Sequence, residues 1–193
     1  MSFRLTLLSI ALLFSAPTQR DRFIIPNVDV FDGYRIVRNR TITVERGMIA
    51  SIDAAAGKPS GLTLLPGLID AHCHISGESA LAQAAALGVT TALDMWGDPH
   101  ELMPLLQGIE RGEHPNAADL RTSGWGVTVA GGHPSELGVS MPVLGPKSNV
   151  QQFVDARFAE GSNYLKIMYE HSLPTLTLEQ LNALVIAAHR RGK

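Results

Sequence analysis

The sequence predicts an α/β protein in which a short β-rich segment precedes four units, each a strand followed by a helix. Residues 23–63 contain short apolar and β-branched runs, and the turn pairs Asp32-Gly33 and Arg46-Gly47 separate them. From Leu64 onward, apolar runs alternate with helical patterns. This alternation indicates a parallel sheet with helices outside it, either an open doubly wound sheet or part of a (β/α)8 barrel.

The first two units are the most clearly marked. Residues 68–75 form an apolar run, and the Ala-rich residues 78–87 that follow predict a helix that stops at Gly88. Residues 89–96 form the second run. The helix after it is expected to have Asp98 as its N-cap, followed by a proline at the first helical position.

The third and fourth units have weaker strands but recognisable helix starts. The third β run is expected within residues 119–130 and the fourth at residues 164–169, YLKIMY. Ser148-Asn149-Val150-Gln151 resembles a capping box that opens one helix, and Thr177-Leu178-Glu179-Gln180 resembles another. Residues 64–193 number 130, whereas a complete barrel needs about 250. The chain is therefore expected to be truncated, with only half of a barrel.

The N-terminus predicts export. Arg4 precedes the ten-residue apolar run 5–14, and Ser15-Ala16-Pro17 follows, so residues 1–18 resemble a secretory signal peptide. The run is shorter than the roughly 20 apolar residues of a stable membrane span, although a buried element or a short uncleaved anchor would also fit. We expect a periplasmic or extracellular protein. A net charge of −2 gives no footprint for nucleic acid, and a single cysteine allows no disulfide within the chain.

The residues that point to chemistry lie at the end of the first apolar run, Asp70-Ala71-His72-Cys73-His74. In a strand, His72 and His74 point to one face and Cys73 to the other. Two imidazoles on one face suit zinc and other borderline divalent metals. A bare pair of this kind is more often an ordinary surface or core pair. Its place at the C-terminal end of an apolar strand, where α/β sites are built, favours a metal site.

The string TLLPGLIDAHCHI closely resembles the first metal-binding strand of the amidohydrolase superfamily. FIIPNVDVFDG and ITVERGMIASI are similar to the N-terminal β-sandwich segment of that family, and GVTTALDMWG is similar to its second barrel strand. VTVAGGHP and NYLKIMYEHS resemble the branch that holds imidazolonepropionase-like and prolidase-like members. The resemblance implies an N-terminal β-sandwich segment at residues 19–63 and the first four βα units of a TIM barrel at residues 64–193.

The resemblance also implies roles for individual residues. His72 and His74 match metal ligands, and Lys166 matches the lysine whose carbamate bridges two ions in binuclear members. The implied cofactor is one or two divalent metal ions, with zinc the expected metal. His133 matches a position near the substrate, with an ordinary loop histidine in a Gly-rich turn as the alternative. Tyr169 follows the fourth apolar run, where it could hydrogen-bond a substrate carboxylate, and Asp94 is a candidate for orienting the ligands. A buried lysine paired with a carboxylate is the structural alternative for Lys166.

One part of the family pattern is missing. Complete members supply two further histidines and a catalytic aspartate from later strands, which would fall beyond residue 193, so no catalytic residue is predicted within this chain. The expected function is metal-dependent hydrolysis of amide, peptide or cyclic amide C–N bonds in a small-molecule or dipeptide-like substrate. The alternatives are an esterase or phosphotriesterase-like hydrolase, and an inactive fragment or non-catalytic metal-binding or interaction protein. Unpaired strand edges would also allow oligomerisation.

Overall fold

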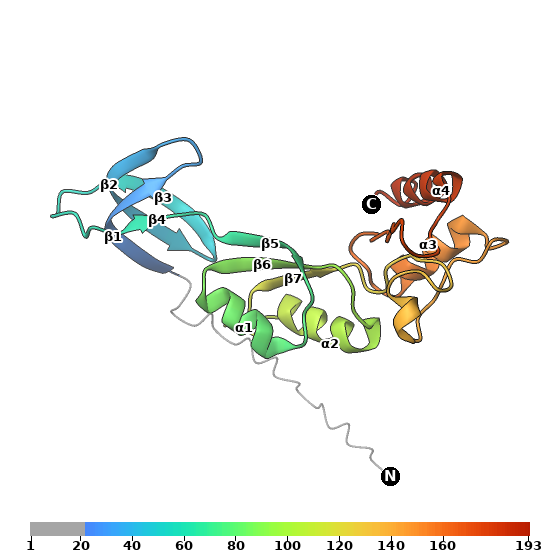
Figure 1. Cartoon of the computed structure of the whole chain (residues 1–193). Coiled ribbons are helices and arrows are strands. Elements are labelled where there is room, and N and C mark those ends of the chain that lie inside the picture. The colour runs from blue at the N-terminus through green and yellow to red at the C-terminus, as the bar shows by residue number, and fades with distance from the viewer. Residues whose placement is uncertain (1–21) are drawn as a thin grey trace, which may run out of the picture. The chain divides into compact units, whose positions relative to one another are not determined.

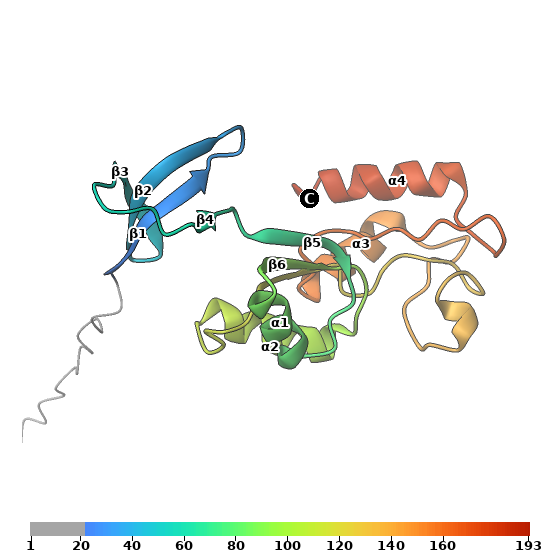
Figure 2. The same cartoon turned by 60° about the vertical axis from the view of Figure 1, so that its left-hand side comes forward.

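The computed structural model describes residues 22–193, which form two compact units divided between Pro66 and Gly67 (Figures 1 and 2). Each unit is described by itself. The predicted signal peptide, residues 1–18, lies outside the described residues and stays a prediction. Between residues 22 and 193, no helix is both long enough and apolar enough to cross a bilayer.

The first unit is one four-stranded sheet with the order β3-β2-β1-β4. Its strands are β1 (Arg22–Phe31), β2 (Ile36–Glu45), β3 (Met48–Ala54) and β4 (Thr63–Leu64). The first three strands pair antiparallel, and β4 pairs parallel with β1. Val28, Val30 and Ile42 form its small core. Residues 22–66 thus supply one sheet, and the β-sandwich expected here stays a prediction.

Both predicted turns of this unit are confirmed. Arg46 and Gly47 have φ values of 51° and 75°, and they join β2 to β3 as a two-residue turn. The Asp32 carboxylate accepts hydrogen bonds from the backbone N–H groups of Arg35 at 2.9 Å and Tyr34 at 3.0 Å. These bonds stabilise the charged form, so they lower the pKa of Asp32.

The second unit contains a parallel sheet with the order β5-β6-β7. Its strands are β5 (Leu68–Cys73), β6 (Val89–Asp94) and β7 (Asp119–Thr122). The helices α1 (Glu78–Ala86) and α2 (Pro99–Glu110) connect consecutive strands and lie along the same side of the sheet (Figure 1). Leu81, Ala92, Leu106 and Leu120 are buried between them. The expected alternation of strand and helix is therefore present, and the fold is mixed α/β.

The helix starts follow the sequence signals with one shift. Asp98 is the N-cap of α2 and accepts from the His100 N–H at 2.9 Å. Thr177 caps α4 (Leu178–His189) in a complete capping box with Gln180. The predicted Ser148 cap of α3 (Val150–Ala159) is wrong by one residue. Asn149 accepts from Gln152, whereas the Ser148 hydroxyl accepts from the Gly145 N–H.

The expected fourth strand at residues 164–169 does not form as a continuous strand. It makes one parallel bridge, between Val127 and Ile167, in which Val127 N–H donates to Lys166 O and Met168 N–H donates to Val127 O. The chain leaves the ladder after β7, where Gly124 has a φ of 56°. Asn163 N–H still donates to Thr122 O at the end of β7, but only Val127 forms a bridge with residues 164–169. Ile167 packs against the core shared by α3 and α4. The half-barrel arrangement itself stays a prediction.

Candidate functional site

The two predicted metal ligands lie on one face at the end of β5. The rings of His72 and His74 have centroids 5.9 Å apart, both are exposed, and both line one cavity of about 710 Å³. Cys73 points the other way, where its thiol donates to Leu93 O at 3.4 Å and packs on the core beneath α1 and α2. The expected alternation of these three side chains is confirmed.

His74 is held in one tautomer by a backbone group. Its Nδ1 lies 3.1 Å from Trp96 O. Because a carbonyl oxygen only accepts, the shared proton belongs to Nδ1, and the lone pair is left on Nε2. This is the second contact that commonly orients a metal-binding imidazole.

Lys166 meets His72 although 94 residues separate them in sequence. Its Nζ lies 3.4 Å from His72 Nε2, and the lysine lines the same cavity as both histidines. The bridge at Ile167 explains this placement, since it fixes the backbone on either side of that residue. Within residues 22–193, no carboxylate lies within ion-pair distance of Lys166, so the structural alternative of a buried ion pair has no partner in that part of the chain.

Asp94 is fully buried at the end of β6 and ties three segments together. One carboxylate oxygen accepts from the Ile75 N–H at 2.9 Å, and the other accepts from the Thr122 hydroxyl at 2.7 Å. The Tyr164 hydroxyl donates to Asp94 O at 2.7 Å, and burial raises the pKa of that tyrosine. Asp94 therefore fixes the backbone immediately after His74 and does not contact the imidazole ring.

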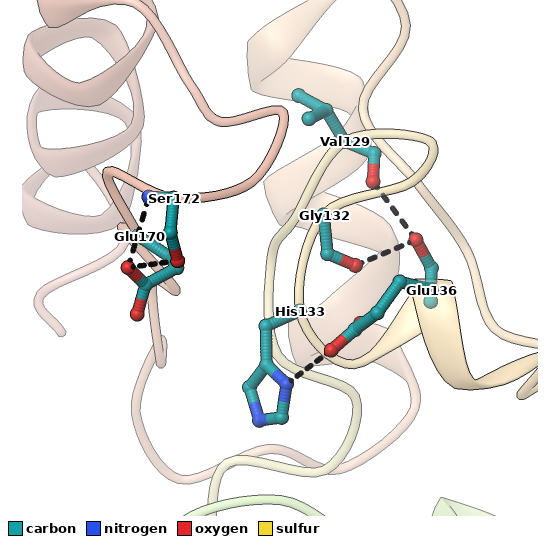
Figure 3. A network of polar contacts seen from close by, with 7 residues as sticks. Val129, Gly132, His133, Glu136, Glu170 and Ser172 are labelled. Atoms are coloured by element: carbon teal, nitrogen blue, oxygen red, sulfur yellow. Dashed lines mark hydrogen bonds and ion pairs between the residues drawn. The ribbon is translucent and has the colours of Figure 1, made fainter.

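His133 enters the cavity from the loop that follows Val127. Its Nδ1 lies 2.8 Å from Glu136 Oε1, as Figure 3 shows. The Ser135 hydroxyl, within the 3-10 turn Ser135–Leu137, lies within hydrogen-bond distance of Val129 O and Gly132 O. These contacts hold the loop in place. Because Glu136 engages Nδ1 of His133, the other ring nitrogen, Nε2, has no part in that contact.

Tyr169 is not brought to the cavity. Its ring packs edge-on against His171 with centroids 5.1 Å apart, and it is absent from the cavity lining. In the same segment, Glu170 accepts from the Ser172 backbone and hydroxyl (Figure 3), and these bonds lower the pKa of Glu170. A substrate contact for Tyr169 stays a prediction.

The cavity also has residues that sequence reasoning did not select. Trp96 follows β6 and Trp125 follows β7, and Met95, Leu102 and Met168 lie beside them in the lining. Asp98, the N-cap of α2, and Glu101, on the first turn of that helix, also line the cavity. The C-terminal ends of parallel strands are where such sites gather, and this signal would have pointed to both tryptophans.

The two faces of β5 differ in how well their side chains could bind a metal ion. Burial, followed by the charges of Asp70 and Asp94, raises the pKa of Cys73 to about 11. A thiol that stays protonated on the core face is a poor metal ligand. Among the described residues, no group of three or more His, Cys, Asp and Glu side chains could together hold a metal ion. The two histidines and the lysine are thus an incomplete donor set.

The described chain has the fold of amidohydrolase-type proteins, as the sequence resemblance implied. No family model matches the chain, and no curated protein sequence matches it.

Three solved structures illustrate the likeness, and each alignment covers 89% of this chain. A Xaa-Pro dipeptidase with bound methionine in its active site gives a TM-score of 0.68 at 18% identity and is covered over 55% of its length. A bottromycin amidohydrolase gives a TM-score of 0.70 at 24% identity, and the alignment covers 37% of its length. A putative prolidase from Bifidobacterium longum gives a TM-score of 0.66 at 22% identity, and the alignment covers 48% of its length. The chain spans about half the length of the solved chains that it matches.

Proposed function

We propose that this chain forms part of the active site of a metal-dependent hydrolase that cleaves C–N bonds in small amide, peptide or cyclic amide substrates. One observation carries the proposal: Lys166 Nζ lies 3.4 Å from His72 Nε2 in the cavity that His74 also lines. The names of the matching structures, a dipeptidase, an amidohydrolase and a prolidase, support the reaction class. We propose that the second unit is the first half of a (β/α)8 barrel.

The nitrogen donors fit a divalent ion, with zinc the preferred metal. His74 offers Nε2 because Trp96 O binds its Nδ1, and His72 offers Nε2 on the same face. When bound, the ion would activate a water molecule and polarise the scissile carbonyl. Catalytic zinc usually has three protein ligands. We therefore assign the remaining ligands and the general base to a segment other than residues 22–193.

Lys166 has two chemically distinct roles open to it, according to whether one ion or two are bound. As an ammonium it would repel a cation held by His72. As a neutral amine its nitrogen can attack carbon dioxide, forming an N–C bond and releasing a proton. The resulting carbamate is negatively charged and has two oxygen donors, so it could hold a second ion.

His133 is proposed to contact the substrate. Glu136 binds Nδ1 of His133, which leaves Nε2 to exchange a hydrogen bond with a group in the cavity. Since the loop is held by the Ser135 hydroxyl, the imidazole needs little reorganisation to do so.

The test is hydrolysis by a protein in which this chain is joined to the segment that supplies the remaining ligands. Dipeptides and N-acyl amides should be turned over, the activity should be lost with a chelator, and zinc should restore it. His72→Ala should abolish turnover, and the matched neighbour Cys73→Ser should retain it. Turnover of esters or phosphotriesters alone would contradict the C–N assignment. Zinc binding without any turnover would instead favour a non-catalytic metal-binding role.

A further inference from the structure

The cavity has an apolar end that the hydrolytic chemistry does not use. Trp96 and Trp125 form its wall, with ring centroids 5.6 Å apart and planes inclined by 61°. Trp96 is also next to His74, at a centroid distance of 6.5 Å. The wall is therefore continuous with the metal-binding end, so one small substrate can reach both.

Each tryptophan is followed by a glycine that lets an apolar neighbour reach the wall. A Cβ on Gly97 would overlap Leu102 Cδ1, and a Cβ on Gly126 would lie 2.5 Å from Met168 Sδ. Because neither glycine has a Cβ, Leu102 and Met168 pack against the backbone of the residue that follows each tryptophan, and both also line the cavity. Indole, thioether and methyl groups thus line this end of the cavity, a surface suited to another apolar or aromatic side chain.

The nearby charges do not change this preference. Asp98 and Glu101 also line the cavity. The Asp98 carboxylate already accepts from the His100 N–H as the N-cap of α2. Glu101 is exposed and solvated, and Lys166 is at the histidine end beside His72. Repulsion by the two carboxylates disfavours an acidic side chain at the tryptophan wall. A basic side chain would lose its hydration against the indole rings, and one of the two carboxylates is already engaged by the His100 N–H.

We propose that the Trp96–Trp125 end of the cavity is a subsite for a bulky apolar side chain next to the scissile amide. This inference rests on the proposed function, which places the amide carbonyl beside His72 and His74. The subsite would select phenylalanine- or leucine-like substrates over lysine- or aspartate-like ones.

The protein carries its own probe for this subsite. Its two tryptophans are the only ones in the sequence, and both line the cavity, so intrinsic tryptophan fluorescence reports on this wall. The chain is titrated without metal with the N-acetyl amides of phenylalanine, leucine, lysine and aspartate. We expect a saturable change with the first two and at least about tenfold weaker binding of the others. Equal binding of all four amides, or no saturable change, would overturn the proposal.

Two variants and a control locate the binding. Trp125→Ala should weaken binding of the phenylalanine amide about tenfold or more, with Trp96 as the remaining reporter. Leu137→Glu provides a second variant with little risk to folding, since Leu137 lines the cavity and is 69% exposed. It should weaken the same ligand by introducing a charge. Tyr34→Ala, at a position 96% exposed in the first unit, should change nothing. Wild-type affinity in both cavity variants would contradict the subsite.

The binding titration and the hydrolysis assay can fail separately. Selective binding of apolar amides without hydrolysis would uphold the subsite and overturn only the proposed function. Metal-dependent hydrolysis with no preference among the four side chains would uphold the function and overturn the subsite.

Discussion

Replacing Asp94 by alanine is predicted to destabilise the second unit by about 3 kcal/mol. The fully buried carboxylate accepts two hydrogen bonds, from Ile75 N–H and the Thr122 hydroxyl. A bond to a charged group contributes about 1.5–3 kcal/mol, so the pair sets an upper value of about 6 kcal/mol. Removal of the carboxylate also removes the cost of keeping a charge buried, which lowers the expected loss toward the smaller figure.

The assay is urea unfolding followed by fluorescence of the two tryptophans. Asp94→Ala should lower the midpoint with an unchanged m-value. Asp94→Asn is the matched control, because its amide oxygen can still accept from Ile75 N–H and its amide nitrogen can donate to Thr122 Oγ1. We expect it to lose only about 1 kcal/mol. The reasoning would be refuted if alanine cost less than about 0.5 kcal/mol, or if asparagine cost as much as alanine.

Three further predictions follow from the site and the sequence. Residues 19–193, supplied with zinc, should hydrolyse no dipeptide, amide or ester, because two imidazoles and one lysine leave the donor set incomplete; metal-dependent turnover by a monomer would contradict this. Cys73 should react slowly with iodoacetamide at pH 8, since a pKa of about 11 against an ordinary value of 9.0 lowers the thiolate fraction roughly a hundredfold, and the rate should rise with pH toward that pKa. Fast alkylation of the folded protein, as fast as in urea, would show that the thiol is not on the core face. Finally, mass spectrometry of protein from the producing cell should find a new N-terminus near residues 15–20, and an intact Met1 in the cytosolic fraction would count against export.

Local signals in the sequence predicted much of the fold. The caps at Asp98 and Thr177 and the turn at Arg46-Gly47 are satisfied within a few residues of themselves, so the sequence alone identifies them. The shift of one residue at α3 has the same local origin. Ser148 and Asn149 can both cap, and the hydrogen bond from Gly145 to the Ser148 hydroxyl leaves the cap to Asn149.

The fourth strand and the wall of the cavity could not be predicted in the same way, because both depend on contacts between residues that are distant in sequence. Residues 164–169 have the composition of a strand, but pairing requires a partner, and Val127 is the residue of the neighbouring segment that forms the bridge. Alternation along β5 placed His72, Cys73 and His74 correctly because it needs no partner. The positions of Trp96 and Trp125 just after two expected strands could have marked both as site residues, but their contact with each other joins segments distant in sequence, and no local periodicity predicts it.

The central claim is that His72 and His74 hold a divalent metal through Nε2, and a zinc titration followed by NMR of the histidine rings tests it most directly. The chain has seven histidines, so His100, His171 and His189 serve as internal controls outside the cavity. The account predicts saturable shifts at the Nε2 side of His72 and His74, no comparable shifts at the three controls, and unchanged behaviour in Cys73→Ser. Uniform shifts at all histidines, or shifts that persist at His74 after His72→Ala with wild-type affinity, would contradict it.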